Sequence, residues 1–387
     1  MRYIISDITG RTLNYDFELC KAVKNSIAED NVVEFWGQND FTDPPFKVRS
    51  FSSIVSKKNK SKSSSLILAA KAFEAVCSYV RIVFLVALLK PSTFHLQWFP
   101  FLSLGIKGGR IDIFFVKLLK LVSKTTRLVF TIHNLCPHSM KDDERDAYNI
   151  IFAKALALFD SFVVHTEQTK EDVCMLFHLA EDSVNVIHHG VFVPESVKFE
   201  RKEWNPDEVR IIMYGAQNWY KGTDIFVDAI SLLPKEIKSK IQVSICGVVD
   251  SEMEKACSNK DTGLDINWMS FYLTDQQLYE EIEKSDIIVL PYRRISQSGV
   301  LLLALATKRI IVTSDLPTFK ETLSEYSDDL FFKSGDPQSF ARLLGKYVDG
   351  TIERTKILDS LELLCEKYSW TSAAQKTICL YRSIKVC

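Results

Sequence analysis

The chain has 387 residues, which is long for one domain and predicts about two. Its hydrophobic content of 47%, charged content of 25% and net charge of −1 are typical of a soluble globular protein and provide no global field that would select a nucleic acid. Nine cysteines with no CxxC pair favour free thiols in a reducing compartment over a disulfide framework or a zinc site.

The first half of the chain alternates short apolar runs with stretches of helical spacing. The N-terminal MRYIISDITG is interpreted as a first strand and a turn, because it lacks the features of a signal peptide. We expect strands at residues 3–6, 32–36, 94–98, 127–132, 161–164 and 184–187, and helices at 15–27, 66–89, 111–122, 146–159 and 168–177.

Two neighbouring stretches raise the question of a membrane. Residues 57–65 are basic and serine-rich, which fits either a solvated loop or contact with anionic lipid or a phosphate-bearing acceptor. The apolar, partly basic stretch 66–89 follows; it either packs in the core or lies on a membrane surface. Its most apolar part, residues 80–89, is too short to span a bilayer, which needs roughly 20 residues.

Three predicted strands end in histidine, at His133, at His165 and at the pair His188 and His189. One interpretation is a metal site, but adjacent imidazoles on an extended chain point to different faces, and no HExxH motif is present. The position just beyond a parallel strand is where α/β enzymes place their chemistry. We therefore favour one catalytic histidine and expect the others to hydrogen-bond loops.

A polar, proline-bearing stretch, residues 192–207, is the best candidate for a linker. After it the pattern begins again, which predicts a second doubly wound α/β domain and a cleft between the two. We expect strands at residues 209–214, 241–246, 266–269, 286–290 and 309–313, and helices at 224–233, 275–284, 300–307, 336–348, 357–368 and 370–384.

The stretch 289–321 reads as strand, polar loop, helix and second strand. The loop contains Arg293, Arg294 and Gly299 just before the helix. Free N–H groups and a partial positive charge at a helix N-terminus favour an anion, so residues 296–300 are a candidate phosphate site. The alternative is an ordinary capped helix with solvated arginines.

Several short motifs occur in an order and spacing that resemble the GT-B glycosyltransferases, specifically the large retaining family 4 of bacterial cell-surface polysaccharide enzymes. The resemblance covers nearly the whole chain. Its landmarks are His95-Leu-Gln-Trp98, Thr131-Ile-His133-Asn134 with Pro137-His138, Val186-Ile-His-His189-Gly190, Tyr214-Gly215 with Tyr220-Lys221-Gly222, Leu290-Pro-Tyr292 with Gln297-Ser298-Gly299-Val300, Asp315-Leu-Pro317 with Glu321, and Tyr368-Ser-Trp370.

The resemblance implies two Rossmann-like domains facing each other across a cleft. Residues 1–195 would bind the acceptor and residues 205–369 the donor, with the helix 370–387 crossing back to the first domain. The implied reaction moves a hexose-type sugar, with retention, from a UDP- or GDP-sugar to a polysaccharide or polyprenyl-diphosphate-linked acceptor. It implies no metal and no cofactor. The enzyme would be cytoplasmic and would touch the inner face of the membrane without spanning it.

The resemblance also assigns roles to residues, with His133 as the catalytic group. Those implied for the donor diphosphate are Lys221, Arg293, Ser298, Gly299 and Val300. Those implied for the sugar or nucleotide are Gly215, Gln217, Tyr292, Gln297 and Glu321. On the acceptor side they are His95, Trp98, Asn134 and His138. Alternatives remain: Lys221 as a solvated loop lysine, and the arginines as partners of surface carboxylates.

The chain departs from the family pattern at three positions. Gln297 and Leu305 stand where the family usually carries two glutamates, the second of which holds the ribose hydroxyls, and Ala216 stands where an arginine is frequent. These departures motivate a rival hypothesis, a non-catalytic GT-B partner subunit, which nucleotide binding would test. A GT-B epimerase or phosphorylase is a further alternative, which a sugar-transfer product would test.

Overall fold

The computed structural model describes residues 1–38, 40–51, 65–136, 140, 142–191, 193, 197–258, 260–295, 299–323 and 327–383. The chain divides into two compact units. Unit 1 consists of Met1–His189 with Trp370–Cys387, and unit 2 of Gly190–Ser369.

In unit 1 the described residues form a sheet of seven parallel strands in the order β3-β2-β1-β4-β5-β6-β7. The strands are β1 (Arg2–Asp7), β2 (Val32–Gly37), β3 (Lys47–Ser50), β4 (Thr93–Leu96), β5 (Arg127–Thr131), β6 (Ser161–Val164) and β7 (Val184–Val186). The helices are α1 (Leu13–Ser26), α2 (Ser65–Leu89), α3 (Gly109–Val122), α4 (Arg145–Leu156), α5 (Glu167–Phe177) and α14 (Trp370–Ser383).

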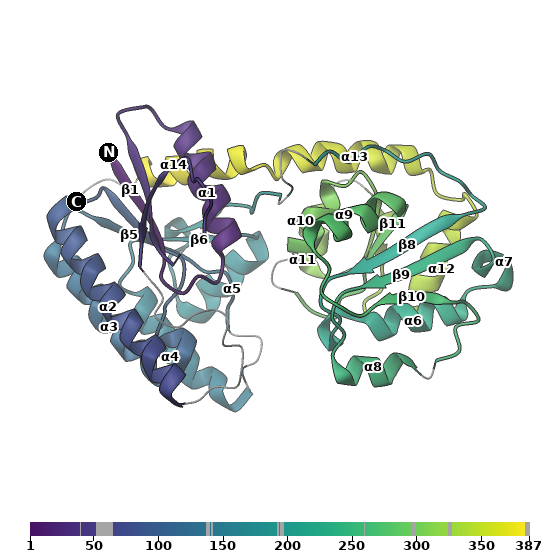
Figure 1. Cartoon of the computed structure of the whole chain (residues 1–387), viewed down its shortest axis with the longest axis horizontal. Coiled ribbons are helices and arrows are strands. Elements are labelled where there is room, and N and C mark those ends of the chain that lie inside the picture. The colour runs from purple at the N-terminus through teal and green to yellow at the C-terminus, as the bar shows by residue number, and fades with distance from the viewer. Residues whose placement is uncertain are drawn as a thin grey trace. The chain divides into compact units, whose positions relative to one another are not determined.

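Strands β4 and β6 are buried along their whole length and β5 at every position after Arg127, as expected for central strands of a parallel sheet. Helices α2, α3 and α4 form one row of neighbours, and α14, drawn in yellow in Figure 1, packs beside α1. The last helix is tied to the sheet through Tyr381, whose ring lies 5.1 Å from that of Tyr3 and whose hydroxyl lies 2.7 Å from Nδ1 of His95.

In unit 2 the described strands form a second parallel sheet in the order β10-β9-β8-β11-β12-β13. They are β8 (Val209–Tyr214), β9 (Ile241–Cys246), β10 (Ile266–Met269), β11 (Ile287–Leu290), β12 (Ile310–Ser314) and β13 (Phe331–Phe332). The helices are α6 (Thr223–Leu232), α7 (Lys235–Lys238), α8 (Ser251–Ser258), α9 (Asp275–Lys284), α10 (Gly299–Leu305), α11 (Pro317–Leu323), α12 (Pro337–Val348) and α13 (Arg354–Lys367).

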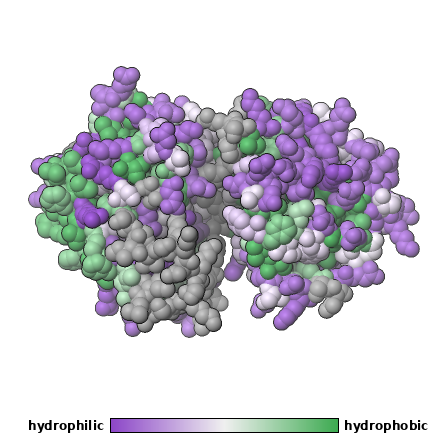
Figure 2. Space-filling model, in the orientation of Figure 1, coloured by the Kyte–Doolittle hydropathy of each residue, from purple (hydrophilic) through white to green (hydrophobic). Residues whose placement is uncertain are grey.

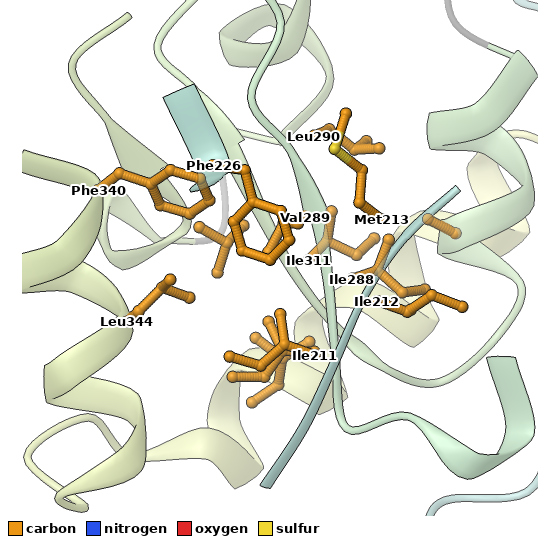
Figure 3. Packing of buried hydrophobic residues seen from close by; sticks show 14 of the residues in the cluster. Ile211, Ile212, Met213, Phe226, Ile288, Val289, Leu290, Ile311, Phe340 and Leu344 are labelled. Atoms are coloured by element: carbon orange, nitrogen blue, oxygen red, sulfur yellow. The ribbon is translucent and has the colours of Figure 1, made fainter. Parts of the chain in front are cut away.

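The core of unit 2 is aliphatic along the strands and aromatic where helices meet them. Figure 3 shows Ile212, Ile288 and Ile311, which are register neighbours on three adjacent strands, and Phe226 of α6 facing Phe340 of α12. Phe340 also stacks on Phe332 with a ring separation of 4.0 Å. Short 3-10 turns complete the described structure, at Leu102–Leu104, Ile106–Gly108, Asp142–Glu144, Glu181–Ser183, Trp219–Lys221 and Asp328–Leu330.

Both sheets have the same doubly wound topology. Counted within each unit, the strand order is 3-2-1-4-5-6 in unit 2 and the same with a seventh strand added in unit 1. The direction of winding therefore reverses between β1 and β4 in unit 1 and between β8 and β11 in unit 2. Ligands of open α/β sheets bind beyond the carboxyl ends of the strands at this reversal. The loops that follow these four strands are therefore the places to look for a site. The predicted GT-B architecture of two parallel Rossmann-like halves is confirmed.

Helix α2 is longer than the apolar run 80–89 that the sequence analysis judged too short to span a bilayer. Its stretch Ala69–Leu89 is long and apolar enough to cross a membrane by length and composition, and 33% of it is buried in the protein. The short run 80–89, judged too short to span, is only the second half of this helix. Of the predicted basic run 57–65, residues 57–64 lie outside the described residues, and Ser65 begins α2.

The sequence prediction missed β3, α7, α8, α11 and β13. Strand β3 lies at the sheet edge, carries alternating basic residues and is not fully buried at any position, so it lacks an apolar pattern. Helix α8 buries few residues and β13 has only two. The strand expected at 94–98 ends at Leu96, and the chain then turns into the loop that carries Gln97 and Trp98.

Candidate functional site

In unit 2 two loops meet where the strand order reverses. One connects β8 to α6 and the other follows β11. The backbone N–H of Arg293 donates to the carbonyl of Tyr220 at 2.8 Å. Gly222, at φ +73°, approaches the carbonyl of Pro291 so closely that any Cβ there would overlap it. This close approach requires glycine and holds the two loops together.

Lys221 lies in the first of these loops and is buried, with 6% of its surface exposed. Its ammonium lies against Gly215, where an added Cβ would overlap Nζ, and 5.5 Å from the ring of Tyr292. Among the described residues, no carboxylate pairs with this ammonium and no group accepts a hydrogen bond from it. Burial lowers the pKa of Lys221 to about 8. An anion bound here would supply the missing partner.

Gln217 organises the same loop from inside. Its side chain is buried, and Nε2 donates to the carbonyls of Gly215 at 2.6 Å and of Cys246 at 3.1 Å. Its Oε1 accepts from the hydroxyl of Thr223 at 2.7 Å. Because the amide is engaged on both sides, Gln217 shapes the turn at Gly215, which lies at φ +100°. The predicted contact of Gln217 with a donor remains a prediction.

The start of α10 closes on this loop from the other side. The hydroxyl of Tyr214 donates to the carbonyl of Val300 at 3.0 Å, and Cγ2 of Val300 would lie 3.7 Å from a Cβ built on Gly215. Around Gly299 there is open space. The structure thus brings Gly215, Lys221 and Val300 together. The predicted residues Gln297 and Ser298, and Ser296 before them, lie outside the described residues.

Arg293 is held by an acidic partner in unit 2. Its guanidinium forms two bonds to the carboxylate of Asp224, at 2.6 and 2.8 Å, and also donates to the carbonyl of Trp219 at 2.8 Å. Burial raises the pKa of Asp224, but the bonds and charge of Arg293 outweigh it and hold that pKa below its usual range. Arg293 therefore holds the Lys221 loop in place through a carboxylate, as the alternative interpretation of this arginine proposed. Its role toward a diphosphate remains a prediction.

Two other predicted donor residues lie among the described residues of unit 2. Tyr292 is buried, with a carbonyl that accepts from the hydroxyl of Ser314 at 2.6 Å. Glu321 lies half-buried on α11.

In unit 1 the reversal lies between β1 and β4. The carboxylate of Asp7 accepts from the backbone N–H of Thr9 at 2.8 Å, of Gly10 at 3.1 Å and of Thr12 at 3.2 Å, which folds the loop after β1. Trp98, in the loop after β4, donates from Nε1 to the hydroxyl of Thr12 at 3.0 Å. The two loops are therefore linked side chain to side chain.

His133 follows β5 and is central to an aromatic cluster. Its ring stacks on that of Trp98 at 4.9 Å and meets the edge of Tyr15 at 5.2 Å. Its Nδ1 lies 3.3 Å from Nε2 of His165, and its Nε2 lies 3.0 Å from Oε1 of Gln97. Burial, together with the neighbouring histidines, holds the pKa of His133 well below its ordinary value. The ring is therefore neutral at physiological pH.

The hydrogen bonds of this cluster define its tautomers. Nδ1 of His165 lies 2.9 Å from the carbonyl of Ile187, so that nitrogen carries the hydrogen. Nε2 of His165 then accepts, and His133 donates from Nδ1. The remaining Nε2 of His133 is then an acceptor that faces Oε1 of Gln97. A hydrogen bond there requires the Gln97 amide to be turned so that its Nε2, which otherwise has no partner, donates to the ring. Burial lowers the pKa of His165 to about 4, which fits a neutral chain.

The predicted acceptor-side residues have different environments. His95 is buried inside the unit, with Nδ1 at 2.7 Å from Tyr381 Oη and Nε2 at 2.7 Å from Thr131 Oγ1, and burial lowers its pKa to about 3. Trp98 and Asn134, by contrast, line a pocket of about 50 Å³ beside His133. His138 lies outside the described residues.

Sequence reasoning missed residues that complete the histidine cluster. Tyr15 contacts the rings of His133, His165, His189 and Trp370 at 4.8 to 5.4 Å. Tyr15 lies on α1 and Trp370 begins α14, so only the packing of these helices brings them together. Gln97 follows β4, which pairs with β5 in the sheet, and this pairing brings it to His133 after β5. Among the described residues, no group of three or more His, Cys, Asp or Glu side chains is arranged to hold a metal ion.

Two family models match adjoining parts of the chain. The Glycosyltransferase Family 4 model matches residues 68–193, and the model for glycosyl transferases group 1 matches residues 195–359. The chain belongs to the family 4-type GT-B glycosyltransferases. The family predicted from the sequence motifs is confirmed.

Curated relatives of this glycosyltransferase are distant. An uncharacterized glycosyltransferase of Methanocaldococcus jannaschii is 23% identical over 242 residues, which cover 59% of this chain and 61% of that protein. The D-inositol 3-phosphate glycosyltransferase of Corynebacterium urealyticum is 25% identical over 28% of this chain and 26% of its own length. The match thus spans less than two thirds of either relative.

Solved structures match the glycosyltransferase over almost its full length. Anabaena HepE in complex with UDP has a TM-score of 0.66 at 10% identity, and the match covers 99% of each chain. Sucrose-phosphate synthase from Thermosynechococcus elongatus has a TM-score of 0.70 at 13% identity, covering 99% of this chain and 98% of that one. At such identities the likeness shows the fold.

One departure from the family pattern now has a structural setting. Leu305, at the position where the family usually carries a ribose-binding glutamate, is buried in the core of unit 2 at the end of α10. Its side chain packs among apolar neighbours, so it contributes to stability and offers no polar atom to a nucleotide.

Proposed function

We propose that this protein transfers a hexose-type sugar, with retention, from a nucleoside diphosphate sugar to a glycan or polyprenyl-diphosphate-linked acceptor. The acceptor belongs to cell-surface polysaccharide biosynthesis, and the transfer takes place on the cytoplasmic side of the membrane. Unit 2 binds the donor and unit 1 binds the acceptor. No metal ion takes part.

The observation that carries this proposal is the unpaired, buried ammonium of Lys221. Its burial costs free energy that no described carboxylate offsets, and the structure around it is built to keep it there: Gly215 leaves room for Nζ and Gln217 holds the turn. A donor diphosphate would restore the lost charge–charge contact. Its negative charge grows as the bond to the sugar breaks, so this contact strengthens in the transition state.

Nucleotide complexes among the structural neighbours support a nucleoside diphosphate donor. Anabaena HepE was solved with UDP and with UDP-glucose, and an Escherichia coli trehalose-6-phosphate protein with UDP-2-fluoro glucose. The neighbours match at 10 to 12% identity, so they support the class of donor and leave the base and the sugar open.

His133 is the proposed group of unit 1 that acts on the sugar. Both of its ring nitrogens are engaged, Nδ1 toward His165 and Nε2 toward Gln97. The contact to His165 fixes the tautomer from within the unit. A sugar hydroxyl can therefore reach Nε2 only by taking the place of Gln97, which makes Gln97 the residue that yields on binding. The bound imidazole accepts a hydrogen bond and stays neutral.

The test measures nucleotide binding and transfer separately. UDP and GDP are titrated calorimetrically into the wild-type protein, Lys221→Met and, as control, Lys346→Met, which removes an exposed lysine from α12. We expect one of the two nucleotides to bind, and Lys221→Met to weaken it by about 10- to 100-fold, because a charge-assisted contact contributes roughly 1.5–3 kcal/mol. The control should bind like wild type.

The outcomes separate the rival functions. Absence of binding by either nucleotide would support the non-catalytic partner subunit. Binding without a transfer product on any glycan acceptor, but with an altered free sugar, would support an epimerase. Loss of transfer in EDTA with recovery on adding a divalent ion would contradict the metal-independent mechanism.

A further inference from the structure

The outer face of α2 and α3 in unit 1 exposes large apolar side chains. Figure 2 shows hydrophobic residues gathered over these two helices, at the left of the view. Phe84 and Leu88 of α2 are 66% and 65% exposed, and Phe114 and Leu121 of α3 are 60% and 70% exposed. Isolated exposed apolar residues need no explanation, but adjacent stripes on two packed helices do.

The exposed residues of each helix form one stripe. On α2 the stripe consists of Phe73, Val76, Val80, Phe84 and Leu88, spaced three or four residues apart. On α3 the same spacing interleaves apolar and basic residues, in the series Arg110, Phe114, Lys117, Leu121, with Lys124 one turn beyond. Such spacing keeps side chains on one side of a helix. We name these two stripes together the α2–α3 face.

The opposite side of α2 is fixed in the core of unit 1. Tyr79, Ile82 and Val86 are fully buried, and the ring of Tyr79 stacks on Phe115 of α3 at 4.6 Å. The hydroxyl of Tyr79 donates to the buried carboxylate of Asp112 at 2.8 Å. Pulling α2 out to span a bilayer would break this bond and expose that surface. Helix α2 is therefore part of the folded unit, and only its outer side is available for contact with a membrane surface.

The exposed charge on this part of the chain is all of one sign. Residues 65–124 include eight basic residues and two acidic ones. Both acids, Glu74 and Asp112, are buried. Lys71, Arg81 and Lys107 are exposed, as are the three basic residues of the α3 stripe and its extension. The α2–α3 face thus combines apolar stripes with positive charge and offers no exposed carboxylate.

We propose that the α2–α3 face docks on the surface of an anionic lipid bilayer. Aromatic and aliphatic side chains enter the boundary between head groups and acyl chains, and the surrounding cations meet anionic head groups. A second copy of the chain fits the face poorly, because it would bring two cationic surfaces together without carboxylates to pair with them. The proposal does not rest on the transfer reaction, and it uses residues other than the lysine run at 57–62.

The experiment measures sedimentation of the protein with vesicles of phosphatidylcholine, with and without phosphatidylglycerol. We expect binding only when phosphatidylglycerol is present, and a loss of about tenfold or more when salt is raised from about 0.05 to about 0.5 M. The double variant Phe84→Asp with Leu88→Asp, and separately Arg110→Glu with Lys117→Glu, should each reduce binding at least tenfold. The matched control Leu363→Asp changes a residue on α13 that is 64% exposed, and it should bind like wild type.

Melting temperature and nucleotide affinity are measured on every variant, so a folding defect or a failed donor site is distinguished from lost lipid contact. Where Asp substitutions lower the melting temperature, Phe84→Ser with Leu88→Ser replaces them. Equal binding of wild type and the face variants to anionic vesicles would overturn the proposal. So would the absence of vesicle binding together with a dimer in sedimentation velocity that the Phe84 variant dissociates, which would assign the face to a second copy.

Discussion

The two units share the order of their first six strands, but the loops at the reversal of strand order carry different side chains. In unit 2, glycines at 215 and 222 open a space beside a buried lysine that has no described partner. In unit 1, the corresponding loops are joined by hydrogen bonds among Asp7, Thr12 and Trp98. All seven histidines of the chain lie in unit 1, and unit 2 has none.

This difference shows what a fold supplies and what it leaves to side chains. The doubly wound sheet places loops at the reversal in either unit, but the chemistry there depends on residues that the topology does not dictate. In unit 2 the ammonium of Lys221 has no described acidic partner, which suits the reversible binding of an anion. Unit 1 holds neutral imidazoles in a defined tautomer chain, which suits groups without net charge, such as sugar hydroxyls.

The largest expected effect concerns His133. If unit 1 acts on the sugar alone, His133→Ala should reduce transfer by at least about 100-fold, as loss of a transition-state contact does, while UDP or GDP affinity stays within about twofold. Gln97→Ala removes a competitor for Nε2 and should reduce transfer far less. A folded His133→Ala protein that keeps most of its turnover would end this division of labour and direct attention to His165 or His189.

A glycine pair tests whether the two loops differ in function. Gly10 and Gly215 both have positive φ, at +63° and +100°. A Cβ on Gly10 would lie 3.4 Å from Gln38, whereas one on Gly215 would overlap Nζ of Lys221. Each change to Ala should lower stability by about 1 kcal/mol or somewhat more. Only Gly215→Ala should weaken nucleotide binding, by about tenfold. Equal binding by both variants would separate Lys221 from the donor.

The pH dependence of nucleotide binding sharpens the role of the buried lysine. Because the pKa of Lys221 is about 8 in the unliganded protein, its ammonium is lost as pH rises above that value. A diphosphate favours the charged form, so the dissociation constant should be steady just below pH 8 and rise by up to about tenfold per pH unit above it. Lys221→Met should bind weakly with no such rise. Parallel profiles for the two proteins would contradict the assignment.

The buried histidines predict a pH effect on unit 1. His95 has a pKa of about 3 when folded, below its value when unfolded, so the unfolded chain takes up the proton first as pH falls. Stability contributed by the neutral ring is present above about pH 6.5 and is lost toward the folded pKa, by about 1.4 kcal/mol per pH unit. The protection factors of the amides in β4 and β5, corrected for the intrinsic exchange rate at each pH, should therefore fall less on acidification in His95→Gln than in wild type. An identical acid response in the two proteins would show that His95 is not the titrating group.

Much of the fold could be predicted from local sequence pattern. Strands such as 209–214 and 287–290 are apolar runs of the right length, buried as central parallel strands require. The motif around Lys221 predicted a loop that carries a basic residue. The strand predicted at 209–214 placed that loop directly after the first strand of unit 2. Edge strand β3 could not be found in this way, since an exposed edge needs no apolar alternation.

The sequence alone determined the family, the alternation of strands and helices, and the residue types near each strand end, because these depend on short-range periodicity and motif spacing. Tertiary structure alone decided which of those residues are free to act. Arg293 and Lys221 look equivalent along the chain, yet Arg293 meets Asp224 and Lys221 meets no described acid. Tyr15 and Trp370 are more than 350 positions apart and pack together. Such contacts depend on the order of strands in each sheet and on which helices pack against it. The burial and the charged neighbours of a side chain therefore depend on the tertiary arrangement and not on adjacent residues in the sequence.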